Sequence, residues 1–145
     1  MNQDGGEEAV GGEMLEAARR AKMKRLVELG IDPWGGRFDD STPIGEIRAL
    51  ESKIEAEPQE EGSDRPPQEN GPKVRAAGRI VLQRKKGKLI FVDIRDASGQ
   101  IQLFIGRNQV GDENWAVAEC FDLGDIIGVD GELKHTRTGE LTIFA

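Results

Sequence analysis

The second half of this sequence is a succession of short apolar segments separated by turns, and it limits the fold more than any other feature. Three segments rich in β-branched and aromatic residues come first, and a helical stretch and two further apolar segments follow. This pattern predicts five strands and one helix. The strands are expected over residues 74–82, 89–95, 101–105, 126–133 and 141–145, and the helix over residues 111–122.

The order of these elements predicts a mainly β fold, a five-stranded OB-fold barrel of the order β-β-β-α-β-β. Glycines within the strands, such as Gly78, suit the bulges and sharp bends of a small barrel. Within the second strand, Ile90, Val92 and Ile94 form one uniformly apolar face, which we expect to line the barrel. A simple open meander with a helical cover is the competing interpretation.

Composition divides the chain into four parts. Residues 1–12 are rich in glycine and acidic residues and are expected to form a disordered tail. Residues 13–54 form an N-terminal helical segment, and residues 73–145 form the barrel domain, whose fifth strand ends as if truncated. Residues 55–72, called the acidic linker below, have no apolar residue beyond Ala56 and are expected to be flexible, because they bury too little surface to offset ordering entropy.

The N-terminal segment contains two helix candidates. Residues 13–29 lack glycine and proline, and their apolar side is narrow, so we expect that side to lie against another part of the protein. A short second helix is expected over residues 43–53. Trp34 and Phe38 are the expected anchors of the irregular connection between the two helices.

The net charge of −7 argues against nucleic-acid binding only until its distribution is considered. The acidic residues are concentrated in the tail and the acidic linker, whereas residues 13–29 and 73–145 each carry a small excess of basic residues. A local basic patch, rather than the net charge, determines whether phosphate is attracted.

Several protein classes are excluded. No apolar run approaches the ~20 residues of a membrane span, and the N-terminus has no secretory signal, so we expect a soluble cytoplasmic protein without a membrane partner. Cys120 is the only cysteine and His135 the only histidine, which leaves too few ligands for a disulfide framework or a zinc site. The same scarcity argues against a hydrolase built on Ser/His/Asp or Cys/His.

A basic connection joins the first two strands. It spans residues 83–88 and contains Arg84, Lys85, Lys86 and Lys88. Clustered cations of this kind bind phosphate in a salt-dependent way. The alternative is a solvated turn whose charges only protect a sheet edge.

Phe91 shares a strand face with charged neighbours, so we expect its ring on the outer surface of the barrel. An exposed ring on a sheet can stack a nucleic-acid base, at about 1–3 kcal/mol per base. Coverage of the ring by the N-terminal helix is the alternative. Gln102 shares the outer face of the third strand with Phe104, and we expect it close to Phe91, where its amide could read a base edge.

The barrel sequence resembles the N-terminal anticodon-binding domain of class IIb aminoacyl-tRNA synthetases, the lysine, aspartate and asparagine enzymes. The matching residues are Gly78-Arg79-Ile80, Arg84, Gly87-Lys88, Phe91-Val92, Arg95-Asp96 and Gly99-Gln100-Ile101-Gln102-Leu103-Phe104. Other stretches are similar to the bacterial lysine enzymes in particular: Arg19-Arg20-Ala21-Lys22, Leu29-Gly30-Ile31-Asp32-Pro33, Gly124 to Gly131 and Thr136 to Leu141.

The resemblance implies that Phe91 stacks the middle anticodon base, a uracil, and that Arg84 and Gln102 hydrogen-bond it. Glu140 matches an acidic position that contacts an anticodon base. The partner implied is therefore a tRNA with U at the middle anticodon position. For the parent protein, a homodimer in this family, the resemblance implies ATP-dependent attachment of lysine to tRNA in a C-terminal domain that uses ATP and magnesium. That domain is not in this sequence, so we expect no cofactor and no catalytic residue here.

Two departures from the family pattern stand out. The acidic linker is longer than the connector expected, and it would repel tRNA if it folded across the basic surface. His135 lies where the family often has another residue type, and we expect it to be an exposed turn residue, with a phosphate or base contact as the alternative. The competing function is a stand-alone OB-fold module that binds single-stranded nucleic acid or a protein partner.

Overall fold

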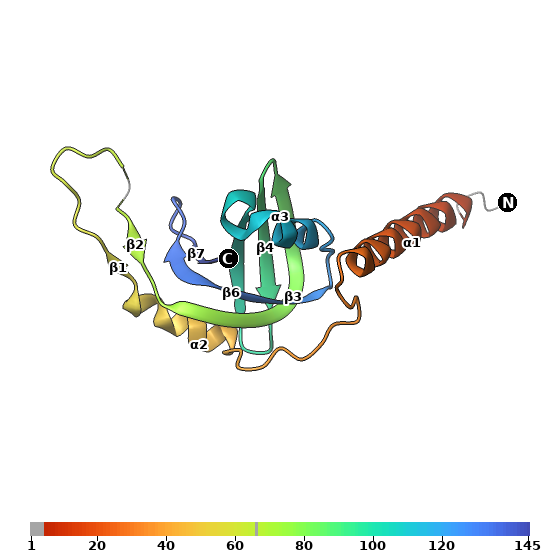
Figure 1. Ribbon diagram of the computed structural model, residues 1–145, viewed down its shortest axis with the longest axis horizontal. Coiled ribbons are helices and arrows are strands. Elements are labelled where there is room, and N and C mark those ends of the chain that lie inside the picture. Colours follow the sequence, from red (N-terminus) through yellow and green to blue (C-terminus); the bar gives the residue numbers. More distant parts are fainter. Residues whose placement is uncertain (1–4, 66) are drawn as a thin grey trace.

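A closed barrel of five strands occupies the centre of the computed structural model, which describes residues 5–65 and 67–145 (Figure 1). Neighbouring strands follow the order β3-β4-β5-β7-β6, and all pairs are antiparallel except β5 with β7. The strands are β3 (Lys73–Lys86), β4 (Leu89–Arg95), β5 (Gln100–Gly106), β6 (Ile126–His135) and β7 (Leu141–Phe144). The OB-fold prediction is confirmed, and the open meander is excluded because β3 pairs with both β4 and β6.

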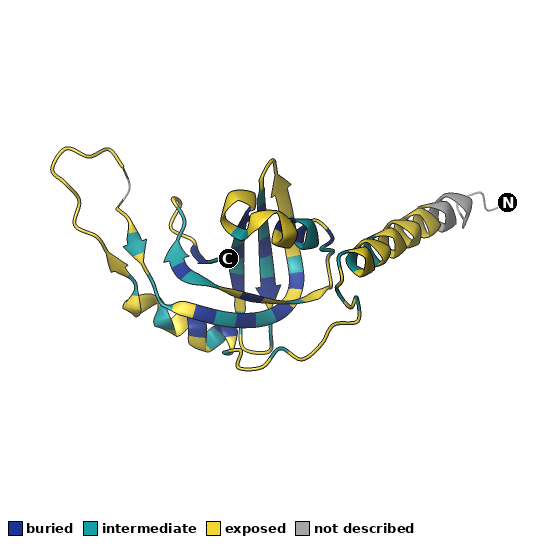
Figure 2. Ribbon diagram, in the orientation of Figure 1, coloured by how far each residue is buried: buried dark blue, intermediate teal, exposed yellow. Residues whose placement is uncertain are grey.

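The barrel interior is lined by alternate residues of the strands, which appear as dark blue bands in Figure 2. Ile90, Val92 and Ile94 of β4 are buried, as expected from their shared face. Ile101, Leu103 and Ile105 of β5 are buried in the same way. Leu133 of β6 and Ile143 of β7 complete this interior from the far side of the barrel. Burial of this apolar surface is the main stabilising contribution to the fold.

Strand β3 is longer than predicted and contains a bulge. We expected a strand over residues 74–82 and a basic loop over residues 83–88, but β3 continues to Lys86 and the turn consists of Gly87 and Lys88. The register with β4 shifts between Ile80 and Leu82. Glycine did not mark this bulge; Gly78 is instead a point of close approach, where an added Cβ would lie 2.9 Å from the Arg95 carbonyl oxygen.

Helix α3 (Arg107–Ala118) begins directly after β5 and packs on the barrel through buried Trp115 and Ala118. It starts four residues earlier than the predicted helix over residues 111–122. The prediction began at Gly111, but that residue lies inside α3 with a non-helical φ of +83°. A positive φ of this kind is accessible to glycine at little cost, so it interrupts the helix without ending it.

Helix α1 (Gly5–Glu28) extends away from the barrel (Figure 1). It begins before Glu13, so the predicted disordered tail over residues 1–12 is helical from Gly5 on, and residues 1–4 lie outside the described residues. The expectation that its apolar side lies against another part of the protein holds only at the C-terminal end of that side: Leu15 and Ala18 are exposed, whereas Leu26 and Leu29 are half-buried. Lys22 of α1 contacts the segment that follows α3: its ammonium pairs with Asp122 at 2.6 Å and donates to the Phe121 carbonyl oxygen at 3.4 Å. No helix in the described part of the chain combines the length and apolar character of a membrane span.

A short helix, α2 (Ile44–Ala49), continues into the 3-10 turn η1 (Leu50–Lys53) and closes one end of the barrel with buried Ile44 and Ile47. Its first amide groups are held by the turn between β4 and β5. The Ile44 N–H donates to Asp96 at 2.9 Å, and the Gly45 N–H donates to Ser98 Oγ at 2.9 Å. Burial acts to raise the pKa of Asp96, but hydrogen bonds from the Ser98 hydroxyl and from the backbone N–H groups of Ile44, Ser98 and Gly99 hold it below its ordinary value.

The predicted anchors of the connection between α1 and α2 behave differently from each other. Trp34 is 84% exposed, so its prediction as an anchor is wrong. Phe38 is half-buried, and the guanidinium carbon of Arg75 lies 3.8 Å above its ring. An added Cβ on Gly128 would lie 2.7 Å from the same ring, so the glycine makes room for it.

The acidic linker contains regular structure at both ends. Strands β1 (Glu55–Ala56) and β2 (Glu69–Asn70) pair in an antiparallel register and bring the two ends of the linker together beside β6. The linker was expected to be flexible throughout, and this pairing corrects that expectation at its two ends. Its long, exposed middle projects from the barrel (Figures 1 and 2).

Candidate nucleic-acid interface

Three phenylalanines form a row across the outer surface of strands β4, β5 and β7. Phe91 and Phe104 face each other in adjacent strands with ring centroids 5.4 Å apart in an edge-to-face arrangement. Phe104 and Phe144 are 5.1 Å apart with their planes tilted by 37°. All three side chains are half-buried. Phe91 is therefore on the outside of the barrel, as predicted, and it is neighbouring rings rather than the N-terminal helix that partly cover it.

The bulge in β3 places Arg84 beside Phe91. Before the bulge, even-numbered residues such as Ala76 and Ile80 point into the barrel. After it, the alternation is reversed and Arg84 lies opposite Phe91 on the outer surface. The guanidinium carbon of Arg84 is 5.5 Å from the centroid of the Phe91 ring, within the range of a cation–π contact.

The same alternation divides the lysines of the basic connection. Lys86 lies opposite Leu89 and shares the outer face with Arg84. Lys85 lies opposite Ile90; its ammonium is 3.9 Å from Glu119 and 5.8 Å from the Trp115 ring, so it is directed toward α3 although it also borders the outer cleft. Lys88 is exposed in the turn and does not line the cleft described below. Arg84 and Lys86 are therefore the cations of β3 that face the aromatic row.

Gln102 lies on the outer face of β5, two residues from Phe104 and on a strand adjacent to that of Phe91, as predicted. Its Nε2 donates a hydrogen bond of 3.2 Å to Thr142 Oγ1 of β7, and that hydroxyl donates to the Glu140 carbonyl oxygen at 3.0 Å. These two consecutive hydrogen bonds orient the Gln102 amide at the surface. An amide has two donor hydrogens and an acceptor oxygen, so it retains hydrogen-bonding capacity for a ligand.

A cleft of about 1810 Å³ contains the aromatic row and these polar groups. Phe91, Phe104 and Phe144 lie in its floor together with Arg84 and Gln102. On the β6 side, the Lys134 ammonium lies 4.7 Å from the centroid of the Phe144 ring and 3.9 Å from Glu132. A further cation, Arg137, comes from the turn between β6 and β7. The cleft is also lined by Lys85, Lys86, Arg137 and residues of the acidic linker.

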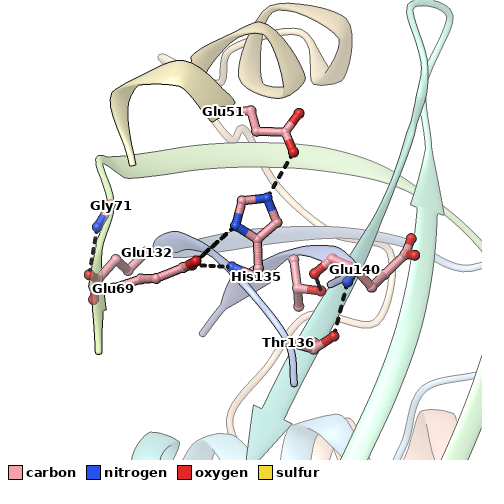
Figure 3. Close-up of polar contacts among 8 residues, drawn as sticks. Glu51, Glu69, Gly71, Glu132, His135, Thr136 and Glu140 are labelled. Carbon is pink, nitrogen blue, oxygen red and sulfur yellow. Dashed lines mark hydrogen bonds and ion pairs between the residues drawn. The ribbon is translucent and has the colours of Figure 1, made fainter. Parts of the chain in front are cut away.

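Glu140 is the one predicted base-contacting residue that the structure does not bring into the cleft lining. It is exposed at the start of β7, where its backbone N–H donates to Thr136 Oγ1 at 3.2 Å. In Figure 3 its carboxylate points away from His135. Its role as a contact to an anticodon base stays a prediction.

His135 is not the exposed turn residue that we predicted. It ends β6, its side chain is 25% exposed, and its ring lies between two carboxylates (Figure 3). Nε2 is 2.8 Å from Glu51 of η1, and Nδ1 is 3.1 Å from both oxygens of Glu69 in β2. The hydrogen bond with Glu51 raises the pKa of His135 above its ordinary value; burial opposes this shift, and Glu69 reinforces it. The ring therefore ties η1 and the acidic linker to the barrel.

The described residues contain no group of three or more His, Cys, Asp or Glu side chains arranged to hold a metal ion. Cys120 is buried, and its Sγ lies 3.4 Å from the Ala116 carbonyl oxygen. Burial raises the pKa of the Cys120 thiol, which disfavours the reactive thiolate. The residues that line the cleft supply stacking, cationic and hydrogen-bonding groups.

Sequence reasoning identified part of this surface and missed the rest. It singled out Phe91, Arg84 and Gln102, but it did not assign a binding role to Phe104, Phe144 or Lys134. Phe104 could have been found, because it alternates with buried residues exactly as Phe91 does on the paired strand. Phe144 could not, because its place beside Phe104 depends on the parallel pairing of β5 with β7.

Comparison with known proteins agrees with this geometry. Residues 74–145 match the tRNA anticodon family, described as an OB-fold nucleic acid binding domain. The chain is 42% identical over 130 residues to the lysine–tRNA ligase of Staphylococcus saprophyticus, a match that covers 88% of this chain and 24% of that protein. It is 40% identical over 130 residues to the lysine–tRNA ligase of Streptococcus suis, covering 90% of this chain and 25% of that protein. The chain thus spans about a quarter of the length of the curated relatives it matches.

Proposed function

We propose that this chain, whose residues 74–145 belong to the family of OB-fold nucleic acid binding domains, recognises the anticodon of a tRNA with uridine at the middle position. In this proposal Phe91 stacks the middle base, while Arg84 and Gln102 hydrogen-bond its pairing edge. The observation that carries the proposal is the position of a half-exposed ring between a guanidinium and a carboxamide on one outer sheet face. Such a ring can stack on a base that is not stacked on its neighbours, which contributes about 1–3 kcal/mol of binding free energy per base.

The polar groups around Phe91 suit a uracil. The pairing edge of uracil presents two carbonyl acceptors on either side of one N–H donor. Arg84 can only donate, whereas Gln102 can donate and accept, so together they can satisfy both kinds of group. Lys86 and Arg137, at the margin of the cleft, are placed to neutralise the phosphates of the strand that carries the base. Lys85 at this margin and Lys88 in the adjoining turn add to the general positive charge of the region.

For the whole protein we propose the activity named for its relatives, lysine–tRNA ligase. In that reaction lysine and ATP give a lysyl adenylate and pyrophosphate, and the lysyl group then passes to tRNA with release of AMP. ATP, magnesium and the homodimer implied by the family, and the cytoplasm as the place of action, belong to this wider proposal. We assign no step of the reaction to residues of this chain, and we expect the chain alone to catalyse no lysine-dependent exchange of pyrophosphate into ATP.

The proposal is tested by the affinity of the chain for RNA stem-loops that differ at one base. We expect replacement of the middle anticodon uridine by cytidine to weaken binding by about 1–3 kcal/mol, because a wrong base leaves its edge contacts unmade. The control is the same replacement at a loop position outside the anticodon, which should change affinity little. Equal affinity for the uridine and cytidine loops would reject anticodon reading and favour a module that binds single strands without sequence preference.

A further inference from the structure

The acidic linker is attached to the barrel by its own specific contacts. The Gly71 N–H donates to Glu132 Oε1 at 3.0 Å, and the His135 N–H donates to Glu69 Oε2 at 2.8 Å. An added Cβ on Gly71 would lie 1.6 Å from the Leu133 carbonyl oxygen, so only glycine permits this close approach to β6. The His135 ring adds bonds to Glu69 and Glu51 (Figure 3). The base of the linker is therefore held at one edge of the cleft.

From this base the linker forms a wall of the cleft. The Glu57 N–H donates to the Gln68 carbonyl oxygen at 2.7 Å, and the Asn70 side chain donates to the Glu57 carboxylate at 2.9 Å, which keeps the two sides of the linker together. The residues of the linker that line the cleft include Glu57, Gln59, Glu60, Gln68 and Glu69. The barrel residues that line the same cleft carry the aromatic row and most of its cations.

The two sides of the cleft differ in charge. The linker residues that line the cleft include three carboxylates, Glu57, Glu60 and Glu69, and one arginine, Arg65. The barrel residues that line it include one carboxylate, Glu132, and the cations Arg84, Lys85, Lys86, Lys134 and Arg137. Among the residues that the structure describes, no ion pair joins an acidic residue of the linker to these cations. Lys134 pairs with Glu132 on the barrel, whereas Arg84, Lys86 and Arg137 have no ion-pair partner among the described residues and are left to a ligand. The linker carboxylates add negative charge to the same cleft.

We propose that the acidic linker is a selectivity element of the RNA site, which admits an isolated single strand and excludes duplex RNA. The inference rests on the proposed function and adds the acidic linker to its binding site as a second surface. A single strand can turn its one phosphate chain toward the barrel cations and its uncharged bases toward Phe91. A duplex carries phosphates on both sides, so one of its strands faces the carboxylates of the linker. Repulsion between a carboxylate and a phosphate at short range in water lowers affinity several-fold for each pair, and salt weakens this repulsion.

The test uses the intact chain with four linker carboxylates neutralised and the His135 contacts left in place. The linker variant carries Glu57→Gln and Glu60→Gln in the cleft lining, together with Glu61→Gln and Asp64→Asn in the adjoining exposed part of the linker. A control variant with the same change in net charge, but with all substitutions outside the cleft lining, carries Glu13→Gln, Asp40→Asn, Glu46→Gln and Glu113→Gln. Each protein is titrated, at one low salt concentration, with a uridine-containing anticodon stem-loop and with a blunt RNA duplex of equal length.

We expect the linker variant to bind the duplex about tenfold more tightly than the unmodified chain does, and to bind the stem-loop with less than about threefold change. The control variant should bind both RNAs more tightly than the unmodified chain does, by the same small factor. The proposed selectivity role is wrong if the linker variant binds the duplex and the stem-loop more tightly by the same factor. It is also wrong if neither affinity changes. Failure of the proposed function is a separate result, because it is a property of the unmodified chain: that chain would then bind uridine and cytidine loops alike.

Discussion

Strands β4 and β5 carry two faces made by alternate residues of the same segments, and the two faces differ in what their side chains contact. On the inner face, Ile94 and Leu103 are fully buried among aliphatic residues. On the outer face, Phe91 and Phe104 are only half-buried and touch each other and, for Phe91, a guanidinium. Apolar character alone therefore does not define the core of this domain. The inner residues stabilise the barrel, whereas the outer rings retain exposed surface for a ligand.

The largest effect is expected from truncation on the inner face. Leu103→Ala should lower the free energy of unfolding by about 2–5 kcal/mol, because it leaves a cavity in a closed barrel that cannot collapse around it. Urea denaturation followed by circular dichroism measures this change. A loss below about 1 kcal/mol would mean that the inner face is not the structural core.

Truncation on the outer face should separate binding from stability. We expect Phe91→Ala to weaken binding of the anticodon stem-loop by about 1–3 kcal/mol through the loss of stacking. The cost to folding should be smaller than that of Leu103→Ala, because the ring is only half-buried. It includes the edge contact with Phe104, worth about 0.5–1.5 kcal/mol beyond the burial of the ring itself. Phe38→Ala is the matched control, because Phe38 is also half-buried but lies outside the cleft lining. Unfolding of Phe91→Ala without a binding defect in the remaining folded protein would contradict the division of the two faces.

The comparison extends to neighbouring lysines that β3 directs to opposite sides. Lys86→Gln should reduce the slope of log affinity against log salt by about 0.7, the value for one phosphate contact on a single strand. Lys85→Gln removes the same charge, but its ammonium is already engaged by Glu119, so its slope should change less. Binding isotherms over a range of salt concentrations give both slopes. Equal changes in the two variants would show that only total charge matters at this margin.

The smallest effect is expected in the pH dependence of stability. The folded-state pKa of His135 is raised above the ordinary histidine value of 6.5. Its contribution to stability is therefore complete below pH 6.5 and is lost as pH rises through the folded-state pKa. His135 is the only histidine in the chain, so His135→Gln should flatten the decline in stability above pH 6.5. Urea denaturation at a series of pH values measures the slope, and an unchanged slope would show that the bonds to Glu51 and Glu69 do not stabilise the fold.

Much of the barrel was predictable because its signals are local. The alternation that buries Ile90, Val92 and Ile94 is visible within seven residues, and it also predicts the outward position of Phe91. The order of strands and helix was likewise correct. The helical N-terminus was predicted less well, because strong helix formers favour α1 without indicating whether another surface covers it.

The remaining features depend on pairing between distant residues. No local signal in β3 distinguishes a bulge at residue 81 from a bend at Gly78, yet the bulge decides that Arg84 faces Phe91. His135 and Glu69 are far apart in the sequence, and their contact follows from the position of β2 beside β6. The acidic linker was predicted from composition as solvated chain, which is correct for its exposure but does not reveal that it borders the cleft.

The amino-acid sequence by itself determined the element order, the apolar inner face and the aromatic residue on the outer face, because each is set by residues within one segment. Only the tertiary structure decided which side chains share the cleft with that ring. Closure of the barrel, the reversed alternation after the bulge and the attachment of the linker each bring together residues distant in the chain. Such contacts form only when backbone hydrogen bonds and burial on several strands are satisfied at once, so no single segment can specify them.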